Sequence, residues 1–324
     1  MRPGLAIASL LAPPAASTGA ESVDTLMLGA MALVVFFSVL IFALVVGFSV
    51  RYRAGSDAPR EDPPRGNMRM EVGWLVGVAL LGVVLWAGGA VVFVTEGRPP
   101  QDAVTIAVVA KQWMWKAQHD NGRREINRIH VPAGQPVVLR MVSEDVIHSL
   151  FVPAFRLKQD VLPGRYTTVW FEATRPGTYP LYCAEYCGAD HSGMRAEIEV
   201  MAPADYAAWL AAGAPARSLA AEGAGLFRAK GCSGCHGAPA TVPAPPLEGL
   251  YQRPVVLSDG SSVTADDAYL RDAILQPNKQ IVAGYSPLMP TFQGQLDEDE
   301  LSALIAYVRS LRDERPHRPL EVPQ

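Results

Sequence analysis

Residues 183–194 read CAEYCGADHSGM, and this stretch decides how the middle of the chain folds and what it binds. It places two thiols, Cys183 and Cys187, beside an imidazole, His191, and a thioether, Met194. Sulfur and imidazole donors together prefer copper or zinc to hard cations such as magnesium. The stretch therefore indicates a site for a soft metal.

Several interpretations of this group remain open on the residues alone. A further imidazole, His148, lies about one strand upstream and could be a fifth donor or an ordinary core residue. The two cysteines could form a disulfide. A structural zinc site would use four ligands and leave Met194 idle, whereas a blue site with one copper needs only one cysteine. Two neighbouring thiolates favour two metals that share them, and the softness of the donors favours copper.

The sequence around this group predicts an all-β domain over residues 95–201. Short β-rich runs alternate with turns such as Asn121-Gly122 and Pro163-Gly164, which is typical of an antiparallel β-sandwich or barrel. The runs expected as strands are residues 103–110, 136–142, 166–172 and 196–200.

Two long apolar segments precede the β domain. Residues 26–50 and 72–94 contain no charged side chain, and each exceeds the roughly 20 residues that span a bilayer as a helix. The loop between them carries five arginines, so the positive-inside rule places it in the cytoplasm. We therefore expect a transmembrane hairpin over residues 21–94 in a bacterial inner membrane, with the rest of the chain on the periplasmic side.

The first 20 residues resemble a secretory signal peptide. Arg2 precedes the apolar run 5–12, and small residues follow it. If this signal is removed, the mature chain begins near Glu21.

Composition excludes one class of partner. The chain has 324 residues, of which 49% are hydrophobic and 19% charged, and its net charge is −4. A nucleic-acid-binding protein needs a basic surface that neutralises phosphates, so nucleic acid is not expected as a partner. Membrane lipid is expected as a partner because of the two apolar spans.

A second cofactor motif opens the last part of the chain. Cys232-Ser-Gly-Cys235-His236 has the C-x-x-C-H spacing in which both thiols bind haem vinyl groups and the histidine is an axial ligand. A redox dithiol would need a βαβ context and a zinc site a second pair of ligands, and neither is present in the sequence. Met289 is the only methionine after the motif, and prolines stand on both sides of it, so we expect it as the sixth iron ligand.

The position of the C-x-x-C-H motif sets the expected domain boundaries in the last third of the chain. We expect a linker at residues 202–221, an all-α haem domain at 222–315, with a helix near 297–311, and a tail at 316–324.

The motifs together resemble a known family. The string C-x-E-x-C-x-x-x-H-x-x-M, with the runs 112–115, 145–149, 157–160 and 163–165, is similar to subunit II of haem-copper cytochrome c oxidases. The C-x-x-C-H motif and the M-P-x-F run at 289–292 resemble class I cytochromes c. A chain with both resembles subunit II of the caa-type oxidases, which implies a two-helix anchor, a cupredoxin domain and a tethered class I cytochrome c domain.

The resemblance implies a ligand set for a dinuclear copper centre, CuA. In that family two cysteines bridge the coppers, which here are Cys183 and Cys187. His148 and His191 would each bind one copper, with Met194 as a weak ligand. Glu185 would bind through its backbone carbonyl.

It also implies roles for three further side chains. The carboxylate of Glu185 would reach a magnesium or manganese ion at the boundary with subunit I. Trp113 would lie where electrons enter, although tryptophans two apart on a strand, such as Trp113 and Trp115, often fill a core. Glu71 would stand at the mouth of a proton channel, but it could equally be a solvated helix end, and the proline that usually follows Trp74 in the family is missing.

The implied function is that of an electron-relay subunit in a proton-pumping cytochrome c oxidase, a translocase whose oxygen site lies on subunit I. Subunit III would be a further partner, and the external donor would be a quinol:cytochrome c oxidoreductase or a soluble cytochrome c. A nitric oxide reductase with a CuA subunit is the alternative, because its relay residues would be the same. A quinol oxidase subunit is opposed by the two cysteines of the copper motif, and a copper-delivery protein by the haem motif and the two spans.

Overall fold

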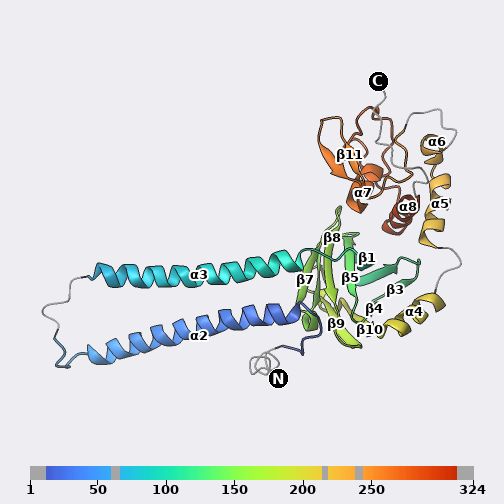
Figure 1. The fold of residues 1–324 in the computed structure, drawn as a ribbon. Helices are drawn as coiled ribbons and strands as arrows, with labels where there is room; N and C mark the ends of the chain where they lie inside the picture. The colour runs from blue at the N-terminus through green and yellow to red at the C-terminus, as the bar shows by residue number, and fades with distance from the viewer. Residues whose placement is uncertain (1–11, 60–65, 214–217, 238–243, 312–324) are drawn as a thin grey trace.

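The computed structural model describes residues 12–59, 66–213, 218–237 and 244–311. Figure 1 shows a helical hairpin that projects from a β-sandwich, with a smaller helical domain beside the sandwich. The first part of the expected signal (1–11), part of the linker (214–217) and the expected tail (316–324) lie outside the described residues.

The hairpin consists of two long apolar helices, α2 (Ala20–Arg51) and α3 (Met68–Glu96). Both are long and apolar enough to cross a membrane, and they contain the two predicted spans. Large apolar side chains such as Phe42 and Phe93 are 70% and 79% exposed. A helix that is apolar on all sides is suited to lipid rather than water, so the hairpin fits a membrane anchor.

Two five-stranded sheets form the sandwich, with strand orders β3-β2-β1-β5-β8 and β4-β10-β9-β6-β7. The first sheet comprises β1 (Val104–Lys111), β2 (Met114–His119), β3 (Arg124–Ile126), β5 (Pro136–Ser143) and β8 (Thr167–Glu172). The second comprises β4 (Arg128–Pro132), β6 (His148–Val152), β7 (Leu157–Val161), β9 (Gly177–Cys183) and β10 (Arg195–Met201). Short 3-10 turns, η1 (Pro153–Phe155) and η2 (His191–Gly193), lie in the connections.

The predicted strands are present, but the expectation of purely antiparallel pairing is wrong. β1 pairs with β5 in parallel, and so does β4 with β10. Parallel neighbours need a long crossover between them, and β2 to β4 provide it for the first pair. The inner faces of both sheets meet in one core that includes Trp115, Leu139 and Ile198.

A short segment before α2 belongs to this sandwich. Ser17 forms a β-bridge with Ala173, and Ala16 lies in the core with no exposed surface. At the start of α2, the buried Asp24 accepts a hydrogen bond from Arg156 Nε at 2.6 Å. These contacts fix the N-terminal end of α2 to the sandwich.

The C-terminal part begins with α4 (Pro203–Ala212), which contacts β4 of the sandwich. It continues with a small helical domain of α5 (Leu219–Ala229), α6 (Ser233–His236), β11 (Pro254–Val256), β12 (Ser262–Thr264), α7 (Asp267–Leu275) and α8 (Glu298–Ser310). The predicted helix at 297–311 is thus present as α8, and Asp297 and Glu300 cap it reciprocally.

The crossing of α5 and α8 requires a glycine. A Cβ atom built on Gly223 would lie 1.9 Å from the carbonyl oxygen of Ala303. Beyond this close approach, the rings of Phe227 and Tyr307 pack with their centroids 5.1 Å apart. The helix pair therefore forms one side of a small domain whose apolar interior is described below.

Candidate functional site

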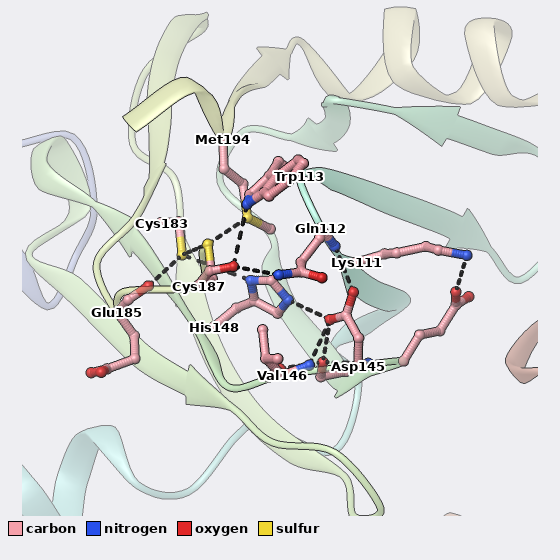
Figure 2. A network of polar contacts seen from close by, with 12 residues as sticks. Lys111, Gln112, Trp113, Asp145, Val146, His148, Cys183, Glu185, Cys187 and Met194 are labelled. Carbon is pink, nitrogen blue, oxygen red and sulfur yellow. Dashed lines mark hydrogen bonds and ion pairs between the residues drawn. The ribbon is translucent and has the colours of Figure 1, made fainter. Parts of the chain in front are cut away.

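The five side chains expected to bind copper converge at one end of the sandwich, and Figure 2 labels four of them, His148, Cys183, Cys187 and Met194. The sulfur atoms of Cys183 and Cys187 are 3.8 Å apart. Nδ1 of His148 is 3.9 Å from the first sulfur, and Nδ1 of His191 is 3.4 Å from the second. Met194 Sδ lies 3.7 Å from Cys187 Sγ. Strands β6 and β9 and the loop before β10 bring these residues together.

Four of the five side chains are buried although they are polar or polarisable, and His191 is half-buried. His148 has no exposed surface, Met194 is 1% exposed and Cys187 is 2% exposed. The thiol of Cys183 also contacts the carbonyl oxygen of Glu185 at 3.2 Å, whereas the Glu185 carboxylate points away from the group (Figure 2). The backbone carbonyl of Glu185 therefore offers a sixth atom that could bind a metal.

The donor set fits a thiolate-bound metal rather than a disulfide. Both cysteines are free. The ligand atoms of His148 and the two cysteines all lie within 4.8 Å of one another. Two imidazoles, two thiols and a thioether are soft or borderline donors, which suits copper.

The two thiols have very different acidities. Burial raises the pKa of Cys183, but hydrogen bonds with His148, with the backbone of Ser149 and Glu185 and with Cys187 together outweigh burial and lower it to about 6. Burial and the neighbouring Cys183 raise the pKa of Cys187 to about 12. One thiolate therefore forms readily at neutral pH, and a bound cation is needed to hold both thiols deprotonated.

Asp145 orients the first histidine, a role that the sequence analysis did not assign. Its Oδ1 accepts a hydrogen bond from Nε2 of His148 at 2.8 Å. Its Oδ2 accepts from the backbone N–H of Gln112 at 2.8 Å. Because Nε2 is held by Asp145, Nδ1 is the nitrogen that faces the sulfurs and would bind a metal there.

A second cofactor cavity lies inside the C-terminal domain. Cys232, Cys235, His236 and Met289, all expected to bind haem, line the same cavity. The remaining wall is mainly apolar and includes Phe227, Leu270, Ile274, Leu304 and Val308. An apolar cavity with two thiols, an imidazole and a thioether fits a covalently attached haem.

The ring of His236 is oriented by a backbone contact. Nδ1 lies 3.1 Å from the carbonyl oxygen of Pro245, which can only accept, so Nδ1 carries the proton. This leaves the lone pair on Nε2, the atom that binds iron in a histidine oriented this way.

Comparison with known proteins matches the two domains that contain these sites. Residues 123–201 match the family "Cytochrome C oxidase subunit II, periplasmic domain", and residues 220–312 match the family "Cytochrome c". Cytochrome c oxidase subunit 2 of Synechocystis is 30% identical over 254 residues, which cover 64% of this chain and 76% of that protein. The chain belongs to the cytochrome c oxidase subunit 2 family.

Other members of the subunit 2 family show how far the similarity extends. Cytochrome c oxidase subunit 2 of Alkalihalophilus pseudofirmus is 28% identical over 292 residues, covering 85% of this chain and 83% of that protein. Alternative cytochrome c oxidase subunit 2 of Bradyrhizobium diazoefficiens is 32% identical over 212 residues, which cover 54% of this chain and 74% of that protein. The solved periplasmic domain of subunit II from Bradyrhizobium japonicum is 29% identical, with a TM-score of 0.35 over 36% of this chain and 96% of that one.

Membership defines the parts of this subunit 2 chain. The sandwich of residues 104–201 is a cupredoxin domain, called the copper domain below, and residues 219–311 form a cytochrome c domain, called the haem domain. The two apolar helices and the periplasmic family match indicate a membrane-anchored protein with a periplasmic domain.

In this subunit 2 chain, Trp113 lies beside the expected copper ligands, where it is half-buried and packs against the edge of the core. It stands between β1 and β2, and its Nε1 donates to the carbonyl oxygen of Cys187 at 3.2 Å. Gln112 Nε2 donates to the same oxygen at 2.7 Å. Trp115 is fully buried, so the two tryptophans do not share an environment. Gly188 has a φ of +115°, a backbone conformation that residues with a side chain rarely adopt, which explains the glycine there.

Glu71 is placed far from the copper and haem sites. It lies in the first turn of α3, where an acidic side chain complements the helix dipole, and it is exposed. The position of Glu71 is compatible both with a solvated helix end and with the channel role that the resemblance implies.

Proposed function

We propose that this subunit relays electrons from a haem c in its haem domain, through a dinuclear copper centre in its copper domain, to the oxygen-reducing site of subunit I. The observation that carries the proposal is the convergence of two free thiols, 3.8 Å apart, with two imidazole Nδ1 atoms and a thioether sulfur. Two thiolates shared between two metals explain why the site contains more sulfur than one ion needs.

The residues divide into bridging and terminal ligands. Cys183 and Cys187 would bridge the coppers, while His148 and His191 would each bind one. Met194 and the Glu185 carbonyl would be weak ligands. When bound, the copper pair and the haem supply one-electron transfer with little structural rearrangement.

The surrounding residues keep the ligands fixed. Asp145 holds the His148 ring in the tautomer that presents Nδ1. Gln112 and Trp113 both bind the carbonyl oxygen of Cys187 and restrain the ligand loop. Burial of the ligands in a sandwich core excludes water and limits their movement.

In the haem domain, four residues would hold the second group. Cys232 and Cys235 would form the two thioether bonds, and His236 would bind the iron through Nε2. Met289 would be the sixth ligand, which favours the reduced iron and raises the potential into the range of electron-transfer cytochromes.

The remaining parts of the proposal concern the complex. We infer a bacterial inner-membrane, proton-pumping oxidase that includes subunit I and subunit III. A quinol:cytochrome c oxidoreductase or a soluble cytochrome c would reduce the haem. Trp113, next to the ligand loop, is the candidate point where electrons enter the copper domain. Glu185 would bind magnesium or manganese with subunit I, and Glu71 would serve a proton channel.

Purification of the intact complex tests the proposal. A tagged chain should co-purify with a subunit that contains a haem-copper site, and the complex should consume oxygen when ascorbate reduces it through a mediator. Reduction of nitric oxide without oxygen uptake would instead indicate a nitric oxide reductase and contradict the proposed partner.

A further inference from the structure

The outward face of one copper-domain sheet is covered. Leu139 and Met141 of β5 point into the core, so the alternating residues Arg140 and Val142 face outward. Nevertheless Arg140 is only 7% exposed and Val142 only 2% exposed. On the neighbouring β1, Val109 faces outward by the same alternation and is 6% exposed.

The haem domain supplies contacts on this face. Arg140 forms an ion pair with Asp267, at the first residue of α7, and both side chains are largely buried, at 8% and 14% exposure. Tyr251 of the haem domain donates a hydrogen bond to the same carboxylate at 3.3 Å. Figure 1 shows α7 near the end of β8, next to this contact.

Tyr166, just before β8, lies close to two guanidinium groups. The Arg140 guanidinium lies 5.1 Å from its ring centroid, and that of Arg271 on α7 lies 5.0 Å away. Arg271 is itself fixed by two hydrogen bonds to Glu298, at 2.5 and 2.6 Å. Tyr166 also packs against the apolar core of the haem domain. Two cations within cation–π distance of one ring, one from each domain, make the contact attractive.

Residues at this contact are linked to both cofactor sites through neighbouring residues. On the haem side, Leu270 and Ile274 of α7 line the haem cavity, on the same helix as Asp267 and Arg271. On the copper side, the Thr167 hydroxyl donates to the Asp160 carbonyl at 2.8 Å.

The connection on the copper side continues to a copper ligand. The Ser149 hydroxyl donates to the Asp160 carboxylate at 2.8 Å, and Ser149 directly follows the copper ligand His148. A path of peptide bonds and hydrogen bonds therefore leads from Tyr166 to the copper ligand His148, while the packing of Tyr166 on the haem-domain core leads towards the haem cavity.

We propose that Arg140, Tyr166 and Asp267 are positioning residues that dock the haem domain on the copper domain in the arrangement from which electrons pass to copper. This inference rests on the proposed function. The buried ion pair is weakly screened by salt, whereas two other pairs across the same boundary are exposed. Arg124–Glu222, at 3.3 Å, and Arg309–Asp120, at 3.9 Å, are the exposed pairs and serve as matched controls.

Charge reversal in the full oxidase complex tests the inference. Arg140→Asp places two acids in contact and should slow haem-to-copper transfer, measured after a flash reduces the haem, by about tenfold or more, which corresponds to about 1.4 kcal/mol of docking free energy. The double variant Arg140→Asp/Asp267→Arg should restore the rate to within about threefold, because the pair is reformed in the opposite sense. Asp120→Asn should leave the rate unchanged.

Spectra separate this test from a failure of the proposed function. The haem absorption and the copper resonance should be unchanged in all variants, because none of the altered residues is a ligand. Oxygen uptake with a photoreductant that reduces copper directly should also be normal in Arg140→Asp. An unchanged internal rate in Arg140→Asp with intact spectra, or no recovery in the double variant, would overturn the inference. If Arg140→Asp does not assemble, Tyr166→Ala should give the same slowing, and an unaltered rate there would overturn it equally.

A second, independent inference concerns processing of the N-terminus. Ala16 N–H donates to the Ala154 carbonyl at 2.8 Å, and the Ala16 carbonyl accepts from Thr174 N–H at 2.9 Å. Ser17 Oγ donates to the Phe155 carbonyl at 3.0 Å. Arg175 donates to the Ala15 carbonyl at 2.7 Å. Ala16 and Ala20 have no exposed surface.

We infer that residues 15–20 are a permanent part of the copper domain and that any leader is cleaved before Ala15. A cut after residue 20 would remove a β-bridge and expose the core where Ala16 packs. Intact mass and N-terminal sequencing of the purified subunit should give a first residue at or before Ala15. A mature N-terminus between Ser17 and Ser22 would overturn the inference.

Discussion

Asp145 accepts a hydrogen bond from Nε2 of His148 at 2.8 Å, and this contact turns Nδ1 of the same ring towards the sulfur of Cys183, 3.9 Å away. The carboxylate therefore determines which nitrogen can bind metal. Burial raises the pKa of Asp145, but hydrogen bonds from the Gln112 backbone and from His148 outweigh burial and lower it. The side chain thus remains ionised at neutral pH and can keep this role.

Replacement of this carboxylate should weaken metal binding without unfolding the domain. Asp145→Asn keeps the size of the side chain but offers an amide that can also donate, so the His148 tautomer is no longer fixed. We expect copper affinity to fall by about 10–100-fold, the usual effect of losing such an orienting partner. Competition with a copper chelator measures this, and unchanged affinity would show that the Cys183–His148 contact alone orients the ring.

Removal of the expected sixth iron ligand should change the haem potential but not haem attachment. Met289→Ala leaves Cys232 and Cys235 to form the thioether bonds. Because the thioether favours reduced iron, we expect a lower midpoint potential. A potentiometric titration measures it, and a potential equal to that of the unaltered chain would mean that another group binds the iron.

A buried carboxylate beside two histidines should make copper-domain stability depend on acid. Burial raises the pKa of Glu125, but hydrogen bonds from the His119 side chain and the His130 backbone outweigh it, so the pKa lies below its ordinary value of 4.5. The carboxylate therefore stabilises the fold above about pH 4.5, and this contribution is lost as pH falls through the lowered pKa. Glu125→Gln should cost about 1–3 kcal/mol at neutral pH and flatten the acid dependence of thermal unfolding. If the thermal stability of the variant fell as steeply with acid as that of the unaltered chain, titratable groups other than Glu125 would be responsible.

Two glycines on one helix provide a matched pair for the haem domain. Gly223→Ala places a methyl group against the Ala303 carbonyl and should destabilise the α5–α8 crossing by about 1–3 kcal/mol. Gly225→Ala meets no atom within 4 Å, so the same substitution there should stabilise α5 by about 0.5–1 kcal/mol. Denaturant unfolding followed by haem absorbance compares them. Equal effects at the two positions would show that the close approach is not required.

Local sequence spacing predicted the elements and the ligand candidates. The uncharged runs predicted both membrane helices, and the helical run with an acidic first turn predicted α8. The C-x-x-x-C stretch predicted a soft-metal site because its donors are close in the chain. Spacing alone left a disulfide and zinc open, and the free cysteines beside two imidazoles favour a metal.

Contacts between distant residues could not be predicted in this way. Arg140 and Asp267 are 127 residues apart, and nothing in either neighbourhood marks them as a pair. The parallel pairing of β1 with β5 depends on the crossover between them and not on either strand's residues. The strand-like contact of Ser17 was obscured because small residues after an apolar run also fit a signal peptide.

The proposed relay requires one chain to hold a two-copper centre and a covalent haem in separate domains. Electron paramagnetic resonance of the purified subunit, combined with metal and haem quantification, tests it most directly. We predict a mixed-valence two-copper signal with two coppers per haem, and we predict that Cys187→Ser abolishes this signal while the haem spectrum is retained. A single-copper or zinc-containing site, or an unchanged copper signal in Cys187→Ser, would contradict the account.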